Sequence, residues 1–176
     1  MLALTRQITF NAGHVYRGGG LSRAELDALF GPAALPSGHG HDYILEVTVE
    51  GEVSSRDGMV VNIKDVDLEL KRIVEPLDHR LLNESVQEFH DAVPTTERLA
   101  QVLWQHFSIS ARIGTSVAAR LRLQEHPGLY VELEGKDPRM IYLTRAIEFA
   151  ASHRLHSDQL GPDENRSVYG KCNNPH

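Results

Sequence analysis

The chain has 176 residues, 41% of them hydrophobic and 24% charged, with a formal net charge of −6 at pH 7. This length suits a soluble protein with one core, and the acidic balance without a basic stripe excludes a typical nucleic-acid binder. A single cysteine excludes an internal disulfide and favours a reducing compartment. Because no apolar run approaches membrane-spanning length and no signal peptide is evident, we expect a cytoplasmic protein that contacts no membrane.

The first third of the chain predicts two strands and a short helix. Residues 4–14 place apolar side chains at alternate positions, which is typical of a half-buried strand. Residues 22–30 open with serine and glutamate at capping-box spacing, which predicts a short helix. A second strand is expected from 41 to about 51, because β-branched and aromatic residues are frequent there.

The next part of the chain predicts two longer helices among further strands. We expect a short strand over 59–63, a helix from about Lys64 to Pro76, and a polar, irregular loop over 77–83. A second helix is expected to open at 94–97 and to continue through Phe107, with Thr95 as its N-cap. Strands are predicted over 118–125 and 129–133, joined by a turn. Two helices laid over one face of an antiparallel sheet make an α+β fold.

Three histidines on the two N-terminal strands form a candidate metal site. Residues two apart on a strand share a face, so His39 and His41 project side by side, and Gly38 and Gly40 leave that edge uncrowded for an approaching ligand. His14 ends the apolar row of the first strand, so the three imidazoles converge if the strands pair. Three neutral nitrogens and an open position are typical of catalytic zinc. The alternative is ordinary surface or capping histidines in a chain that has 10.

The C-terminal segment repeats the N-terminal one. Residues 140–149 resemble residues 1–10, and the offset of 139 residues holds without a gap to the end of the chain. We therefore expect one module over 1–139 and the opening part of a second over 140–176. The second copy stops where its own Gly-His-Gly-His would begin, so we expect either a truncated chain or a tail that docks onto something else.

Several motifs follow one another along the first module. Residues 38–43 read Gly-His-Gly-His-Asp-Tyr, 77–83 contain Leu-Asp-His and Leu-Asn, 94–97 read Pro-Thr-Thr-Glu, and 121–127 end in Glu-His-Pro. Together with the first histidine strand they resemble the 6-pyruvoyl-tetrahydropterin synthase and 6-carboxytetrahydropterin synthase family of the tunnelling-fold (T-fold) group. The resemblance covers essentially all of 1–139, and 140–176 resembles the opening segment of the family.

The resemblance implies a fold, a substrate and a cofactor. The fold is an antiparallel four-stranded sheet with two helices on one face, assembled into homo-oligomers. The activity is that of a zinc-dependent lyase that converts the small molecule 7,8-dihydroneopterin triphosphate to 6-carboxy- or 6-pyruvoyltetrahydropterin. Zinc on His14, His39 and His41 would act as a Lewis acid on the substrate side chain. Glu125 would anchor the pterin ring through a bidentate pair of hydrogen bonds.

The resemblance also implies a cysteine base tuned by an Asp-His pair. Asp78 and His79 match that pair, with His79 relaying protons and Asp78 setting its tautomer. The first module departs from the family because Ala33 stands where the cysteine belongs, and alanine cannot abstract a proton. The second copy has Cys172 at this place, beside a lysine that favours the thiolate. Cys172, Asp78 and His79 are therefore the candidate catalytic residues.

Other interpretations stay open at this point. One is a catalytically weakened module that binds pterin and metal without the base, and another is a retro-aldol cleavage of the dihydroneopterin side chain with a different base. For the single residues, Asp78 and His79 can simply cap a loop, Glu125 can be a solvated charge at a strand end, and Cys172 can be an inert small hydrophobe.

Overall fold

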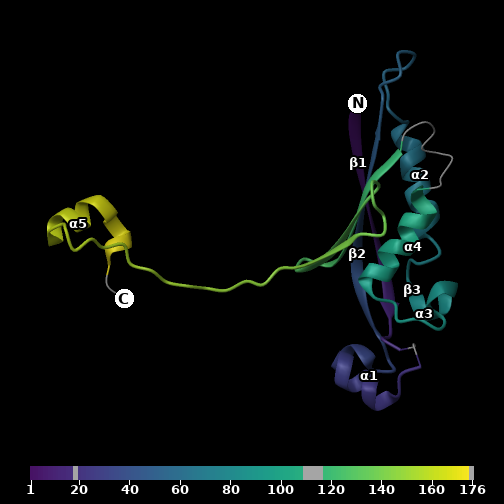
Figure 1. Ribbon diagram of the computed structural model, residues 1–176, viewed down its shortest axis with the longest axis horizontal. Helices are drawn as coiled ribbons and strands as arrows, with labels where there is room; N and C mark the ends of the chain where they lie inside the picture. The colour runs from purple at the N-terminus through teal and green to yellow at the C-terminus, as the bar shows by residue number, and fades with distance from the viewer. Residues whose placement is uncertain (18–19, 109–116, 175–176) are drawn as a thin grey trace. The chain divides into compact units, whose positions relative to one another are not determined.

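The computed structural model describes residues 1–17, 20–108 and 117–174 (Figure 1). It divides into two compact units, Met1–Ala146 and Ile147–His176. The boundary lies beyond residue 140, where the sequence repeat begins, because the first strand of the repeat belongs to the sheet of the first unit. Among the helices described, none is both long and apolar enough to cross a membrane.

A six-stranded sheet forms one layer of the first unit, in the order β3-β1-β2-β4-β5-β6. All neighbours pair antiparallel except β3, which runs parallel to β1. The predicted four-stranded antiparallel sheet was therefore wrong in its strand count, since β3 and β6 add one strand at each edge and make the sheet mixed. β6 repeats the start of β1 and covers the edge of β5, which would otherwise be open. The strands are β1 (Leu2–His14), β2 (His39–Gly51), β3 (Arg80–Leu81), β4 (Val117–His126), β5 (Leu129–Glu134) and β6 (Ile141–Arg145).

Two long helices, α2 (Ile63–Val74) and α4 (Thr96–Ser108), lie along one face of this sheet (Figure 1). Their apolar stripes were predicted from helical spacing, and they pack on alternate strand residues to form the core. The Thr95 hydroxyl accepts a hydrogen bond from the backbone N–H of Arg98 at 3.4 Å, consistent with an N-cap. The α+β arrangement of a sheet with two helices on one face is thus present. The shorter helices of the first unit are α1 (Arg23–Phe30), η1 (Gly31–Ala34), α3 (Leu82–Ser85) and η2 (Gln87–Phe89).

Two local predictions were wrong. No strand forms over 59–63, because the Asn62 side chain accepts a hydrogen bond from Lys64 N and caps α2 instead. The segment 77–83, predicted to be too polar for the core, forms β3 and the start of α3 and buries Leu82 completely. Its polarity is accommodated because the buried Asn83 amide bonds the backbone of the first unit rather than water.

The second unit reproduces the local structure of a segment of the first. The second unit contains the helix α5 (Pro162–Tyr169) and the 3₁₀ turn η4 (Gly170–Asn173). Their residue numbers are those of α1 and η1 plus the repeat offset of 139. In each helix a glutamate three residues beyond the N-cap accepts a hydrogen bond from the N-cap backbone N–H at 2.8 Å. Each helix ends at a glycine in the left-handed region, with φ of 51° at Gly31 and 54° at Gly170. The repeat in sequence is therefore also a repeat of local backbone conformation.

Candidate functional site

The side chains of His14, His39 and His41 lie together at one end of the β1–β2 pair. The register places His14 opposite His39 and Ala12 opposite His41, so the three imidazoles share the helix-covered face. One ligand atom from each histidine lies within 4.8 Å of the others. His14 Nε2 is 2.9 Å from His39 Nε2. The structure thus brings the three rings to one point.

Gly38 and Gly40 serve the close approach of the two strands. Gly38 has a φ of +69°, and a Cβ there would lie 3.0 Å from the His14 carbonyl oxygen and from a Val15 methyl. A Cβ at Gly40 would lie 3.3 Å from the Ala12 carbonyl oxygen. The interpretation that these glycines leave room for a ligand was wrong, because β1 itself occupies the space.

His14 is held in the form that a metal ligand requires. It is fully buried, and its Nδ1 lies 2.8 Å from the carbonyl oxygen of Pro94. A carbonyl only accepts, so Nδ1–H donates to it and Nε2 keeps its lone pair. Burial lowers the pKa of His14 to about 4, and burial likewise lowers the pKa of His41. Neutral imidazoles with free nitrogens are the form in which histidine binds zinc.

Three buried polar atoms at this place lack a hydrogen-bond partner among the described residues: His39 Nδ1, His41 Nε2 and the Tyr43 hydroxyl. Unpaired polar atoms in the interior cost free energy, so a cluster of them indicates that the site holds a further group. Three imidazoles with an open position fit a zinc ion. The donor set of the site is therefore compatible with the predicted metal.

Glu125 lies beside the imidazoles and is only 6% exposed. One carboxylate oxygen is 3.3 Å from His41 Nε2, and the other accepts a hydrogen bond from the Thr96 hydroxyl at the start of α4. The alternative of a solvated strand-end charge was wrong, because the end of β4 is covered by α4. Sequence reasoning missed Thr96, for which the Pro-Thr-Thr-Glu motif was the available signal.

Tyr16 is a second residue that sequence reasoning missed. Its ring centroid lies 5.0 Å from that of His14 in an edge contact, 6.0 Å from that of His39 and 5.1 Å from that of Phe30. Burial raises the pKa of Tyr16 to about 12, and the negative charge of Glu125 adds to the rise. The phenol is therefore neutral near pH 7 and belongs to the same site.

Asp78 and His79 form a separate pair. Asp78 Oδ1 accepts a hydrogen bond from Asn11 N at 2.8 Å and lies 3.0 Å from His79 Nδ1. The bond from Asn11 is the main cause of the lowered pKa of Asp78, and the bond from His79 adds to it. The pair lines a pocket with Thr9, Phe10, Asn11 and Asp42. None of the three clustered histidines lines this pocket, so the pair and the imidazole cluster occupy different places.

Cys172 belongs to the second unit, in η4, and its side chain is exposed. Exposure alone does not decide between a base and an inert small hydrophobe, so the role of Cys172 stays a prediction. Its carbonyl oxygen accepts a hydrogen bond from Leu155 N at 2.8 Å, just as that of Ala33 accepts one from Tyr16 N at 3.1 Å. Ala33 and Cys172 thus hold the same place in the two copies of the repeat.

The buried His14 predicts an acid-sensitive fold in the metal-free protein. The pKa of His14 is about 4 in the folded chain, whereas an exposed histidine in the unfolded chain has a pKa of 6.5. Between these pH values the unfolded chain therefore binds a proton that the folded chain does not. Above pH 6.5 the imidazole is neutral in both states and the free energy of unfolding is not reduced. As the pH falls to about 4, the free energy of unfolding decreases by about 3 kcal/mol. Urea unfolding of chelator-treated protein at several pH values measures this loss. His14→Gln should flatten the profile, whereas the exposed His106→Gln should not; parallel profiles for all three proteins would contradict the assignment.

Comparisons with known proteins agree with this geometry. The 6-pyruvoyl tetrahydrobiopterin synthase of Pongo abelii is 36% identical over 134 residues, 76% of this chain and 91% of its own. The dihydroneopterin monophosphate aldolase of Pyrococcus furiosus is 39% identical over 101 residues, 54% of this chain and 77% of its own. The solved 6-pyruvoyl tetrahydropterin synthase of Caenorhabditis elegans matches with a TM-score of 0.70 and 28% identity, over 76% of this chain and 95% of its own. The family model described as 6-pyruvoyl tetrahydropterin synthase matches residues 3–136, a range that includes the three clustered histidines and Glu125, and the chain therefore belongs to the 6-pyruvoyl tetrahydropterin synthase family.

Proposed function

We propose that the protein is a zinc-dependent lyase that converts 7,8-dihydroneopterin triphosphate to 6-pyruvoyl- or 6-carboxytetrahydropterin in the cytoplasm. The observation that carries this proposal is the convergence of three imidazoles beside a buried carboxylate, in a chain of this family. The names of the relatives support a pterin substrate. The neutral state of His14 supports a metal ion rather than a charged histidine cluster.

The residues of the first unit have distinct tasks in this proposal. Zinc on His14, His39 and His41 would supply Lewis acidity toward the hydroxyl oxygens of the substrate side chain. Glu125 accepts two hydrogen bonds from the amino group and the ring N–H of the pterin, which orients the ring. Thr96 holds one carboxylate oxygen in place, and each oxygen keeps a lone pair for the ligand.

The Asp78–His79 pair is proposed as the proton relay of a site completed by a neighbouring module. Asp78 takes the hydrogen bond of His79 Nδ1–H, which leaves Nε2 free to accept a proton. The pair lines a pocket different from the imidazole site of its own unit. A homo-oligomer would bring the Asp78–His79 pair of one subunit close to the histidine cluster of another. In the described sheet β1 pairs with β3 only at Ala12 and Gly13, so the rest of that edge of β1 is open to another strand.

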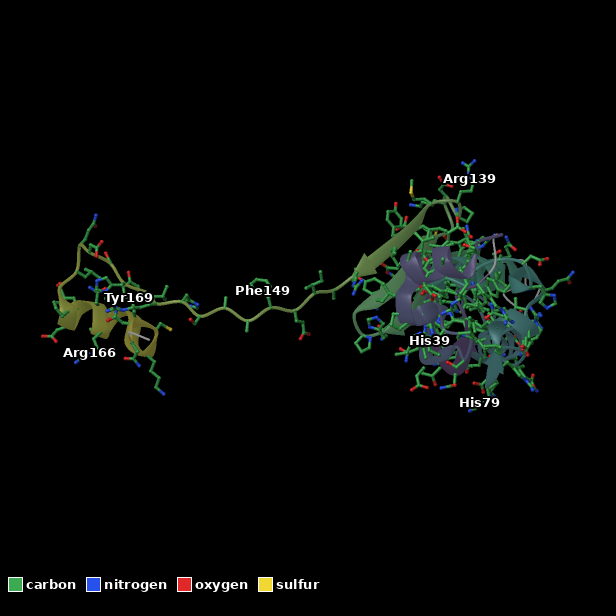
Figure 2. All side chains as sticks on the ribbon, turned by 90° about the horizontal axis from the view of Figure 1, so that it is seen from below. His39, His79, Arg139, Phe149, Arg166 and Tyr169 are labelled. Carbon is green, nitrogen blue, oxygen red and sulfur yellow. The ribbon has the colours of Figure 1, made fainter. Side chains whose placement is uncertain are left out.

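We further propose that Cys172 is the proton-abstracting base and that residues 140–176 open a second module. The repeated helix and turn support this assignment. Phe149 occupies the position in the second copy that Phe10 occupies in the first. Phe149 is 87% exposed (Figure 2), whereas Phe10 is buried under the helices and 4% exposed. The segment that carries Phe149 forms no strand, as expected where no second strand and helix layer pack on it in the described part of the chain.

Two observations favour alternative functions. Ala33 at the base position favours a module that binds pterin and metal without turnover. The likeness to an aldolase favours retro-aldol cleavage of the dihydroneopterin side chain. Both alternatives keep the metal cluster and Glu125, so they differ from the main proposal in the base and the product.

Replacing Cys172 separates these functions. Cys172→Ala should lower turnover of 7,8-dihydroneopterin triphosphate at least about a hundredfold with unchanged zinc content, since a general base contributes about that much. Triphosphate release, pterin products and aldehyde release from dihydroneopterin are measured in parallel, with the exposed Ser167→Ala on α5 as the matched control.

The contrary outcomes are equally distinct. Unchanged turnover in Cys172→Ala removes the thiol from the mechanism. Aldehyde release from dihydroneopterin without triphosphate chemistry favours the aldolase. Tight pterin binding by wild-type protein without any product favours the binding module.

A further inference from the structure

The two copies of the repeat differ by a paired exchange next to the metal cluster. The second copy has Leu155 and Cys172 where the first copy has Tyr16 and Ala33. At these two positions the first copy thus has a phenolic hydroxyl and no thiol, whereas the second has a thiol and no hydroxyl. We consider these two positions together because a backbone hydrogen bond joins them in each copy.

The backbone shows that the two members of each pair are neighbours. Tyr16 N donates to the Ala33 carbonyl at 3.1 Å, and Leu155 N donates to the Cys172 carbonyl at 2.8 Å. The helices and turns around them begin and end at equivalent residues of the two copies, and the glycines that end the helices have nearly the same φ. The two copies therefore share this local backbone, with the phenol on the segment after β1 in the first copy and the thiol in the 3₁₀ turn in the second.

The Tyr16 side chain lies directly against the candidate metal ligands. Its ring makes edge contacts with His14 and Phe30, with centroids 5.0 and 5.1 Å away, and these contacts hold the ring in one orientation. The ring is half-buried, and its hydroxyl is close enough to Glu125 to interact with that charge. Tyr16 thus borders the metal cluster on the side of His14 and His39, within reach of the charge of Glu125.

We propose that Tyr16 is a specificity-determining, substrate-contacting residue of the first site, whose hydroxyl donates a hydrogen bond to the polar side chain of a pterin. This assignment rests on the proposed pterin function. A phenol is a good donor toward hydroxyl oxygens and reaches farther than a cysteine side chain. The ligand class is therefore a pterin with a hydroxylated side chain at the ring carbon that faces the metal.

The test compares two probes that differ only in this side chain. Zinc-loaded full-length protein is titrated with neopterin, which has the hydroxylated side chain, and with unsubstituted pterin, which lacks it. Tyr16→Phe removes only the hydroxyl and should weaken neopterin binding by about three- to tenfold, the usual value of one hydrogen bond. Pterin binding and zinc content should stay unchanged. The exposed Tyr142→Phe is the matched control.

A double substitution tests the exchange itself. Tyr16→Leu should weaken neopterin binding, and adding Ala33→Cys in that background should recover part of it, because the pair of the second copy is then restored. Equal weakening of both probes by Tyr16→Phe, or no weakening of either, overturns the assignment. Wild-type protein that binds neither probe overturns the proposed pterin function, and the assignment with it.

Discussion

Replacing His39 and His41 together by alanine should remove the bound zinc and lower turnover at least about a thousandfold. The two residues provide two of the three converging ligands, and the remaining His14 cannot hold the ion alone. Zinc per chain, measured by elemental analysis, should fall from about one to below about a tenth. Added zinc should no longer raise the melting temperature, because it no longer binds the folded state.

The fold itself should survive this double substitution. His39 and His41 are only partly buried, and their removal eliminates two buried nitrogens that lack a hydrogen-bond partner among the described residues. Far-ultraviolet circular dichroism of the metal-free variant should therefore match that of metal-free wild type. His90→Ala/His106→Ala replaces two exposed histidines outside the cluster and should keep zinc and activity. A full zinc load in the His39/His41 variant would refute the metal assignment.

The cluster could be predicted from the sequence because it depends on one strand pairing. Alternation along 4–14 and 39–51 places the histidines on the apolar faces, and an antiparallel pair of these strands brings His14 opposite His39. The capping box at Ser22 was likewise a local signal, confirmed in the backbone. Local periodicity and a single strand pairing therefore suffice to predict the histidine cluster.

Contacts between distant segments could not be predicted in this way. Leu82 is buried in a stretch without apolar periodicity, because the Asn83 amide pairs with the Val15 backbone and holds the stretch against the sheet. The contact of Thr96 with Glu125 requires the start of α4 to reach the end of β4. Such burial follows from packing, which no local pattern of the sequence encodes.

The location of Asp78 and His79 has the same origin. Their order in the sequence resembles a family motif, but their place is set by β3, a two-residue strand that pairs parallel with β1. The pair consequently lines the pocket of Asn11 and Asp42 rather than the imidazole site. A motif identifies residue types in the correct order, whereas topology decides which of them meet within one module.

The substitution Glu125→Gln should abolish most pterin recognition while the metal site stays intact. A glutamine keeps the shape of the side chain and can keep its contact with Thr96, but it has one acceptor oxygen instead of two and no charge. The bidentate, charge-assisted pair is lost, which costs about 3 kcal/mol, or about a hundredfold in affinity. Both pterin affinity and kcat/KM should fall by this factor. Zinc content should be unchanged, since Glu125 is not among the three clustered ligands.

A matched control and an effect on pH dependence sharpen this test. Glu132→Gln changes a carboxylate on β5 that pairs with Arg120 and should leave pterin affinity unaltered. Burial lowers the pKa of His41, whereas the charge of Glu125 raises it. Glu125→Gln should therefore lower the pKa of His41 further and extend zinc binding to slightly lower pH. If the variant loses zinc together with pterin, Glu125 belongs to the metal site, and if it keeps full pterin affinity, the ring is anchored elsewhere.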